Sequence, residues 1–521
     1  MKSVMAGNGF TAFCCILSGL LLTAGLPKWD LYPLAWCALV PLFVAIRGKT
    51  PREAFGWGYL CGMVHFLTTL YWIRHVIFYY GGLPLPLAIG VLVLLCGYLA
   101  LYPAVFAWVA RRWERQSALW VLGLPAAWVT LEWVRAHALT GFPWANLGYT
   151  QTRFSTLVQV ADVTGVYGIS WLVVLANTVV MSVFARRPSR AGMAVLALCI
   201  AGSLSYGVWR LDQVRELQDG FESWVAAVVQ GNVDQSVKWD PAFQQETLRR
   251  YRELSLKAAA HNPPPDLIVW PETSAPFFYD REPTLTAQLN GLLTEIGRPT
   301  LFGSPAITRE DGEARLQNRA YLVDAQGVSL GAYAKRHLVP FGEYVPLQKL
   351  LFFVRRLVQA AGDFVPGSDS SPIVWGDRKL GVLICYEGIF PALARETVRK
   401  GATALVIITN DAWYGPTSAP YQHLEMARWR AIEFRVPVLR AANTGVSAIF
   451  DSTGRECGRV PLDEAGQLVC VVRSGPIETF YGRRGDVFAW LCVAGALFCA
   501  VLAELVSGTG ATGTRRHAAT G

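Results

Sequence analysis

Long apolar runs constrain the fold of this chain more than any other feature of its sequence. A helix needs roughly 20 apolar residues to cross the hydrocarbon core of a membrane. Seven apolar runs precede residue 210 and an eighth lies near the C-terminus: 10–26, 32–47, 55–78, 84–110, 118–136, 155–185, 192–209 and 487–507. The sequence therefore predicts a polytopic α-helical membrane domain with about eight transmembrane helices.

The composition supports a membrane protein and argues against a nucleic-acid-binding one. Charged residues make up 16% of the chain and hydrophobic residues 53%, whereas soluble domains carry about 25% charged residues. The formal net charge is +9, but the basic residues lie in short clusters between apolar runs rather than in one patch. We therefore expect a lipid bilayer around the chain and no nucleic acid partner.

The basic clusters also predict the orientation of the chain. They follow the second, fourth, sixth and eighth runs: Arg47, Lys49, Arg52; Arg111, Arg112, Arg115; Arg186, Arg187, Arg190; Arg515, Arg516. Because cytoplasmic loops are enriched in Lys and Arg, these ends are expected in the cytoplasm. The sequence then predicts a membrane domain with seven helices at 1–210, an extracytoplasmic domain at 211–485, and an eighth helix with a cytoplasmic tail at 486–521.

Three ionisable residues lie inside the predicted spans. Glu132 and Arg135 are three residues apart, on one helical face, and His65 is in the middle of its span. Charges at membrane depth are costly and usually face a protein interior or a wet cavity. A buried structural ion pair and a role in lipid binding both remain open.

The region from about 222 to 475 alternates strands with helices. Nearly continuous apolar strands are predicted at 224–229, 266–270, 380–385, 404–409 and 436–442, which is typical of sheets covered on both faces. Helices are expected at 244–260 and 418–435, and hairpins at 320–335 and 446–460. This region is therefore an α/β domain with layered sheets.

The cysteines give no sign of a metal site. Of the eleven, most lie in apolar runs, where Cys acts as a small hydrophobe. No CxxC motif or Cys/His pair has the spacing of a zinc site, so we expect no bound metal. Cys457 and Cys470 flank a predicted hairpin and could form a disulfide, which the pattern alone leaves open.

Three different ionisable side chains follow apolar strands of this domain. Glu272 ends IVWPE, Lys335 lies in YAKRHLVPFGEYVP, and Cys385 begins CYEGIF. A carboxylate can take the thiol proton as sulfur attacks a carbonyl, and a lysine can hold the developing oxyanion, helped by a backbone N–H near Tyr386. Glu343 and Glu387 are placed to orient the lysine or share the proton transfer.

Each of these residues also has a structural interpretation when taken alone. Cys385 fits a core position, Glu272 fits a helix cap, and Lys335 fits a solvated loop beside other basic residues. The combination is more specific than its members, because the three types occur together at strand ends.

In their chain order, WPE at 270–272, YAKRHLVPFGEYVP at 333–346 and CYEGIF at 385–390 resemble the Glu, Lys and Cys elements of the nitrilase superfamily. That resemblance implies an α-β-β-α sandwich and a covalent thioester. The flanking membrane spans narrow it, because GFPWANLGYTQ at 141–151, QVADVTGVYGISW at 159–171 and VQGNVDQSVKWD at 229–240 resemble the bacterial apolipoprotein N-acyltransferases.

This second resemblance implies a ping-pong acyltransferase without a cofactor in the bacterial inner membrane, with its catalytic domain on the periplasmic side. Cys385 would take an acyl chain from phosphatidylethanolamine or another phospholipid. It would pass that chain to the α-amino group of the diacylglyceryl-cysteine of apolipoproteins, the last step of lipoprotein maturation. The implied catalytic residues are Glu272 as proton acceptor, Lys335 and Cys385, and the implied supporting residues are Trp239, Glu343, Tyr386 and Glu387.

Candidate substrate-binding residues are more scattered. The stretch KLLFFVRRLV at 349–358 suggests an interfacial lid carrying Phe352 and Phe353, or else an amphipathic core helix. Trp413 and Tyr414 lie in a loop bounded by Gly and Pro, where they guard a pocket or simply pack, and Trp144 lies in the membrane motif at 141–151.

Two other functions remain open at this point. One is a membrane-tethered nitrilase-type amidase or lipid hydrolase, which discharges the acyl group to water. The other is a transporter with a sensor domain, against which the absence of an inverted repeat in the spans argues.

Overall fold

The computed structural model describes residues 7–114, 119–186, 188–235, 241–310, 312–344 and 364–513. Contacts divide the chain into two units. The described residues of 1–71, 90–208 and 486–521 form the helical unit. Residues 72–89 and 209–485 form the α/β unit. Residues 72–89, which the apolar pattern placed among the membrane spans, thus pack with the α/β unit.

Helices account for the predicted membrane spans only in part. Among the described residues, four helices are long and apolar enough to cross a membrane: α5 (Leu85–Trp113), α8 (Val166–Phe184), α9 (Arg190–Asp219) and the apolar part of α15, Val487–Leu505. Shorter apolar helices cover Asn8–Ala24 and Tyr32–Ile46. A membrane protein is therefore supported, and eight separate spans remain a prediction.

Two of the remaining apolar runs contain breaks. In the run 55–78, α3 (Pro51–Thr69) starts at a Thr50 capping box and ends at Thr69, and the chain continues as α4 (Trp72–His75) and η3 (Val76–Tyr80). In the run 118–136, the helix changes type, because the π-helix η4 (Leu119–Gly123) precedes α6 (Leu124–His137), which has 14 residues. Trp72 of α4 is buried, whereas η3 contains no buried residue, so the apolar composition of the run 55–78 does not correspond to one continuous buried helix.

The α/β unit contains two six-stranded sheets. The first sheet has the order β12-β1-β2-β3-β4-β5, and the second has the order β11-β10-β9-β8-β7-β6. The first sheet's strands are β1 (Ser223–Gln230), β2 (Leu267–Val269), β3 (Thr300–Glu310), β4 (Glu313–Val323), β5 (Ser329–Ala334) and β12 (Gly466–Arg473). The second sheet's strands are β6 (Ile373–Trp375), β7 (Arg378–Ile384), β8 (Ala404–Thr409), β9 (Val438–Ala442), β10 (Ser447–Phe450) and β11 (Glu456–Val460).

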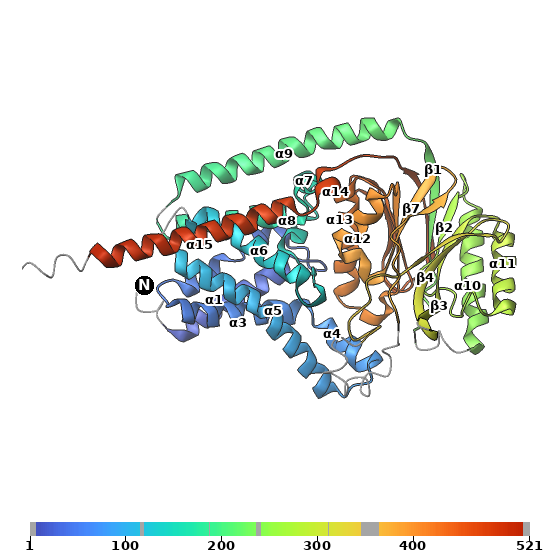
Figure 1. Ribbon diagram of the computed structural model, residues 1–521, viewed down its shortest axis with the longest axis horizontal. Coiled ribbons are helices and arrows are strands. Elements are labelled where there is room, and N and C mark those ends of the chain that lie inside the picture. The colour runs from blue at the N-terminus through green and yellow to red at the C-terminus, as the bar shows by residue number, and fades with distance from the viewer. Residues whose placement is uncertain are drawn as a thin grey trace, which may run out of the picture. The chain divides into compact units, whose positions relative to one another are not determined.

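The two sheets and the helices that cover them form four layers, held together by apolar packing (Figure 1). One core joins the facing sides of the two sheets and includes Val228, Val382 and Val406. A second core covers the first sheet with α10 (Pro241–Ala259) and α11 (Pro283–Ile296), and a third covers the second sheet with α12 (Pro391–Arg399) and α13 (Ala419–Phe434). The expected α-β-β-α sandwich is confirmed.

This arrangement explains why the predicted strands read as continuous apolar runs. β8 is buried along its whole length, and so is β9. The central strands of each sheet are covered on both faces, on one by the other sheet and on the other by helices. The parallel pairs β1·β2, β7·β8 and β8·β9 place carboxyl ends of strands at a shared edge.

Cys457 on β11 and Cys470 on β12 form a disulfide that links the two sheets. The two cysteines are 13 residues apart in the sequence, so the disulfide closes a short loop. A crosslink of this loop length restricts the unfolded chain and is worth about 3 kcal/mol. We expect the double variant Cys457→Ala, Cys470→Ala to have a clearly lower thermal midpoint. Cys37→Ala, at an exposed free thiol, is the control. Equal midpoints for all three proteins would contradict the prediction.

Candidate active site

The three residues predicted as a triad follow three strands of the α/β unit. Glu272 follows β2, Lys335 follows β5, and Cys385 follows β7. All three are buried, with exposed fractions of 6%, 1% and 6%. Lys335 Nζ lies 3.8 Å from Glu272 Oε1. The Cys385 side chain interacts electrostatically with both of them. The fold thus brings together three residues that lie far apart in the sequence.

Glu343 holds the lysine more closely than Glu272 does. Lys335 Nζ donates to Glu343 Oε1 at 2.8 Å, and the Val339 N–H donates to Glu343 Oε2 at 2.8 Å. Burial lowers the pKa of the Lys335 ammonium, but the carboxylates of Glu343 and Glu272 outweigh burial, so the pKa is raised above its ordinary value. Lys335 is therefore a fixed buried cation at neutral pH.

Asn318 on β4 links the carboxylates of Glu272 and Glu343. The sequence patterns did not predict this residue as part of the site. Its Nδ2 donates to Glu272 Oε1 at 2.7 Å and to Glu343 Oε1 at 3.3 Å. The Asn410 N–H, after β8, donates to Glu272 Oε2 at 2.9 Å. Both oxygens of Glu272 therefore accept hydrogen bonds. Asn318 lies between a glutamine and an arginine in β4, so its polar type alone gave no signal in the sequence.

Cys385 occupies an unusual backbone conformation at a sharp turn. Its φ is +55°, in the left-handed region, at the start of the short helix η9 (Cys385–Ile389). Burial is the main cause that raises the pKa of its thiol, and Glu272 adds to the rise while Lys335 opposes it. The resting thiol is therefore protonated at neutral pH, and its attack on a carbonyl requires a base.

Glu387 connects the lysine segment with the cysteine turn. Its carboxylate accepts hydrogen bonds from the N–H groups of Ile384 at 2.7 Å, Arg336 at 2.7 Å and His337 at 3.0 Å. The Tyr333 hydroxyl donates to the same carboxylate at 3.0 Å. Burial raises the pKa of Glu387, and the backbone donors oppose the rise. Glu387 thus positions Lys335 and Cys385 without contacting either side chain in these bonds.

The aromatic candidates in this unit divide between the nucleophile turn and a loop beside it. Tyr386 is buried next to Cys385 and packs edge-on against Phe390, with ring centroids 5.0 Å apart. In the loop that follows Asn410, Trp413 lies 4.8 Å from Tyr80 and Tyr414 lies 4.9 Å from Trp72, centroid to centroid. The segment 72–80 therefore covers this loop, and the Tyr80 hydroxyl donates to the Ala412 carbonyl at 3.0 Å.

The remaining candidates belong to the helical unit or lie outside the described residues. Trp144 belongs to the helical unit, where it is buried and stacks on Phe142. Trp239, Phe352 and Phe353 lie outside the described residues.

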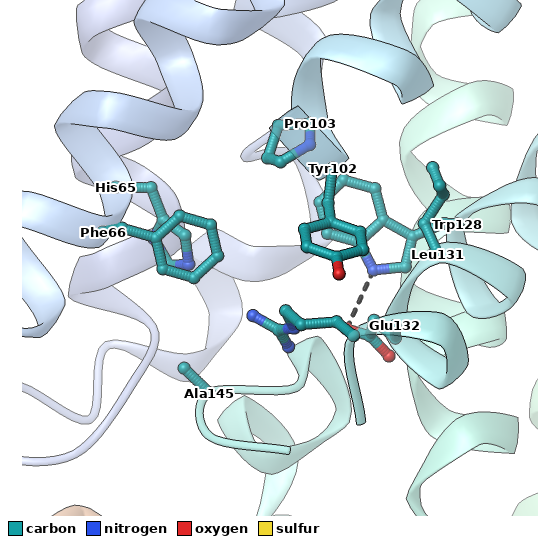
Figure 2. A pocket seen from close by; sticks show the side chains of 9 residues that line it. His65, Phe66, Tyr102, Pro103, Trp128, Leu131, Glu132 and Ala145 are labelled. Atoms are coloured by element: carbon teal, nitrogen blue, oxygen red, sulfur yellow. Dashed lines mark hydrogen bonds between the residues drawn. The ribbon is translucent and has the colours of Figure 1, made fainter. Parts of the chain in front are cut away.

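The ionisable residues of the predicted spans line one small cavity in the helical unit (Figure 2). Trp128 Nε1 donates to Glu132 Oε1 at 2.9 Å, as does the Leu147 N–H at 2.7 Å. Arg135 Nη2 donates to Asn146 Oδ1 at 2.7 Å. The cavity of ≈ 30 Å³ has room for about two water molecules. These bonds fix the loop around 146–147 against α6.

The fold and the strand-end residues define the class of this domain. Residues 225–474 match the carbon-nitrogen hydrolase family. Among solved structures, an amidase from Nesterenkonia sp. is similar, with a TM-score of 0.38 and 22% identity, over 51% of this chain and 95% of that chain.

The helical unit and the full-length relatives specify the family. Residues 18–179 match the apolipoprotein N-acyltransferase N-terminal domain. The chain is 46% identical to an apolipoprotein N-acyltransferase of Geobacter metallireducens, over 94% of each chain. It is 35% identical to that of Allorhizobium ampelinum, over 87% of this chain and 86% of the relative. The chain belongs to the apolipoprotein N-acyltransferase family.

Proposed function

We propose that this acyltransferase moves a fatty acyl chain from a phospholipid, such as phosphatidylethanolamine, to the α-amino group of the diacylglyceryl-cysteine of apolipoproteins. The acyl group passes through a thioester on Cys385. The observation that carries this proposal is the buried pair of Lys335 and Glu272, whose charged atoms are 3.8 Å apart. Both residues interact electrostatically with the Cys385 thiol.

In the first half-reaction, Glu272 takes the thiol proton as Cys385 Sγ attacks the ester carbonyl carbon. The negative charge that develops on the carbonyl oxygen lies beside the Lys335 ammonium, and the Tyr386 N–H in the nucleophile turn is a second donor. When the ester C–O bond breaks, the proton on Glu272 passes to the leaving oxygen. The products are a thioester and a lysophospholipid.

In the second half-reaction, the α-amino nitrogen of the lipoprotein attacks the thioester carbonyl. Glu272 accepts a proton from this nitrogen, the C–S bond breaks, and the sulfur recovers the proton. The product is an amide, and the enzyme returns to its starting state. Glu343 keeps Lys335 in place in both halves, because its Oε1 accepts from Nζ at 2.8 Å.

The membrane supplies both substrates. Four described helices are long and apolar enough to anchor the chain, and we place eight transmembrane helices in the bacterial inner membrane with residues 211–485 on the periplasmic side. The charge pattern of the loops supports this orientation. Enzyme and substrates are then confined to one interface, which lowers the entropy cost of their meeting. Trp413, Tyr414, Trp144, Phe352 and Phe353 are the proposed contacts to acyl chains, and Trp239 is a proposed supporting residue.

Mass spectrometry of the Cys385 peptide tests the proposal. The purified protein is incubated with phosphatidylethanolamine, and a diacylglyceryl lipopeptide with a free amino terminus is then added. We expect a hydroxylamine-labile acyl adduct that moves to the lipopeptide amine. Discharge only to water would make the protein a lipid hydrolase with the same residues, and a folded protein that never acquires an adduct would reject the thioester.

A further inference from the structure

A second set of buried side chains lies behind the nucleophile turn and contacts Cys385 through its backbone. His423 on α13 places Nε2 at 3.2 Å from the Cys385 carbonyl oxygen. A carbonyl oxygen only accepts hydrogen bonds, so Nε2 carries the hydrogen and donates it. This bond acts on the residue whose φ of +55° is energetically unfavourable for a side chain with a Cβ.

The imidazole is itself held from its opposite edge. Its Nδ1 lies 3.1 Å from Asp411 Oδ1 and 3.2 Å from Arg440 Nη2. Arg440 Nη2 donates to Asp411 Oδ2 at 2.7 Å, and the Thr409 hydroxyl donates to Asp411 Oδ1 at 2.9 Å. The ring therefore has a fixed orientation before any substrate arrives.

Burying polar and charged side chains is costly unless they form hydrogen bonds or ion pairs. His423, Asp411 and Arg440 are at most 1% exposed. Burial raises the pKa of Asp411, but Arg440 and His423 outweigh it, so the carboxyl stays ionised. The three residues come from η10 (Asp411–Tyr414), α13 and β9, so they join three elements to the turn at one point.

We propose that Asp411, His423 and Arg440 form a positioning network that holds the Cys385 turn in its left-handed conformation and thereby sets the rate of thioester formation. None of the three takes part in the proton transfers described above. The inference rests on the proposed function, because it assigns the network to the acylation of Cys385.

Two amide substitutions at position 423 separate positioning from bulk stability. In His423→Gln, the amide nitrogen reaches the place of Nε2, so the donor to the Cys385 carbonyl is retained. In His423→Asn, the shorter amide retains a donor near Nδ1 and leaves the carbonyl oxygen without its partner. The control is His261→Asn, the same chemical change at an exposed residue of the same unit.

The measurement is the single-turnover rate of adduct formation on Cys385 at saturating phosphatidylethanolamine, with folding checked by near-UV circular dichroism. We expect His423→Asn to lower this rate about 100-fold, the size of a small misplacement of a reacting atom. The rate of His423→Gln should stay within about tenfold of the rate of the unmodified protein. The phosphatidylethanolamine concentration that gives the half-maximal rate should not change in either variant.

The inference is overturned if both folded variants keep the unmodified rate, or if both lose it equally. If neither variant folds, Asp411→Asn replaces them. This substitution removes the negative charge that holds His423 and hardly changes the shape of the side chain. An unmodified acylation rate in Asp411→Asn would then overturn the inference. Absence of any adduct on the unmodified protein would instead reject the proposed function.

Discussion

Replacing Cys385 with alanine should abolish acyl transfer. In the proposed mechanism, the sulfur of Cys385 is the only protein atom that forms a bond to the acyl group. Removal of a nucleophile has cost about 10⁶-fold in a well-studied hydrolase, and we expect a loss of at least about 10⁴-fold here. The reaction is followed as the formation of amide-linked acyl chain on a diacylglyceryl lipopeptide, in micelles that contain phosphatidylethanolamine.

The matched control is Cys37→Ala, which removes an exposed free thiol and should leave the rate unchanged. Cys385→Ala should still fold, because alanine fills part of the same buried site and tolerates the turn as well as cysteine does. Transfer within tenfold of the unmodified rate would mean that the acyl group never bonds to this sulfur.

Replacing Lys335 with methionine should lower both the rate and the stability. Loss of one oxyanion donor costs about 10²–10³-fold in rate, which is the drop expected for acylation of Cys385. Removal of one partner of a buried ion pair costs about 3–5 kcal/mol. The cause is that Glu272 and Glu343, which share the ammonium at 3.8 Å and 2.8 Å, would face each other without a cation.

The pH dependence of this contribution follows from the direction of the pKa shift. The pKa of Lys335 is raised in the folded protein. Its contribution to stability is therefore complete below the unfolded value of about 10.4 and disappears only as the pH rises through the higher folded value. Thermal midpoints of Lys335→Met and unmodified protein should differ by a constant amount between neutral pH and the unfolded pKa, and converge above it.

Lys400→Met is the control for this experiment. Lys400 is exposed and lies 3.4 Å from Asp369, and such a surface pair contributes little. Its removal should change neither rate nor midpoint. A Lys335→Met protein that matches Lys400→Met in both measurements would show that Lys335 is outside the reacting site.

The α/β class was predictable because several strands, among them β1, β2, β7, β8 and β9, are apolar runs in the sequence. The strands β3, β6 and β12 were not predicted, and the four-layer order followed from the family resemblance rather than from the pattern. A run such as 404–409 is apolar throughout, and polar catalytic types directly after such runs mark the ends of strands. Asn318 and His423 had no comparable signal. Asn318 is a polar residue inside a strand, and His423 is one of many polar residues in a predicted helix that the structure buries almost completely.

The membrane spans were harder to predict for a related reason. Apolar composition indicates exclusion from water, and both lipid and a protein interior provide it. The structure separates the two cases: the apolar window of α8 is 78% buried inside the protein, whereas that of α9 is 11% buried. The sequence patterns of these two helices do not reveal this difference.

The bonds of Glu387 have a consequence for how this site tolerates sequence change. Its carboxylate holds positions 336, 337 and 384 through their backbone N–H groups, so these contacts are indifferent to the side chains there and exclude only proline. The side-chain requirement in these contacts therefore falls on Glu387 and on Tyr333, whose hydroxyl donates to the same carboxylate. The side chains at 336, 337 and 384 can therefore differ while these backbone bonds continue to join the lysine segment to the cysteine turn.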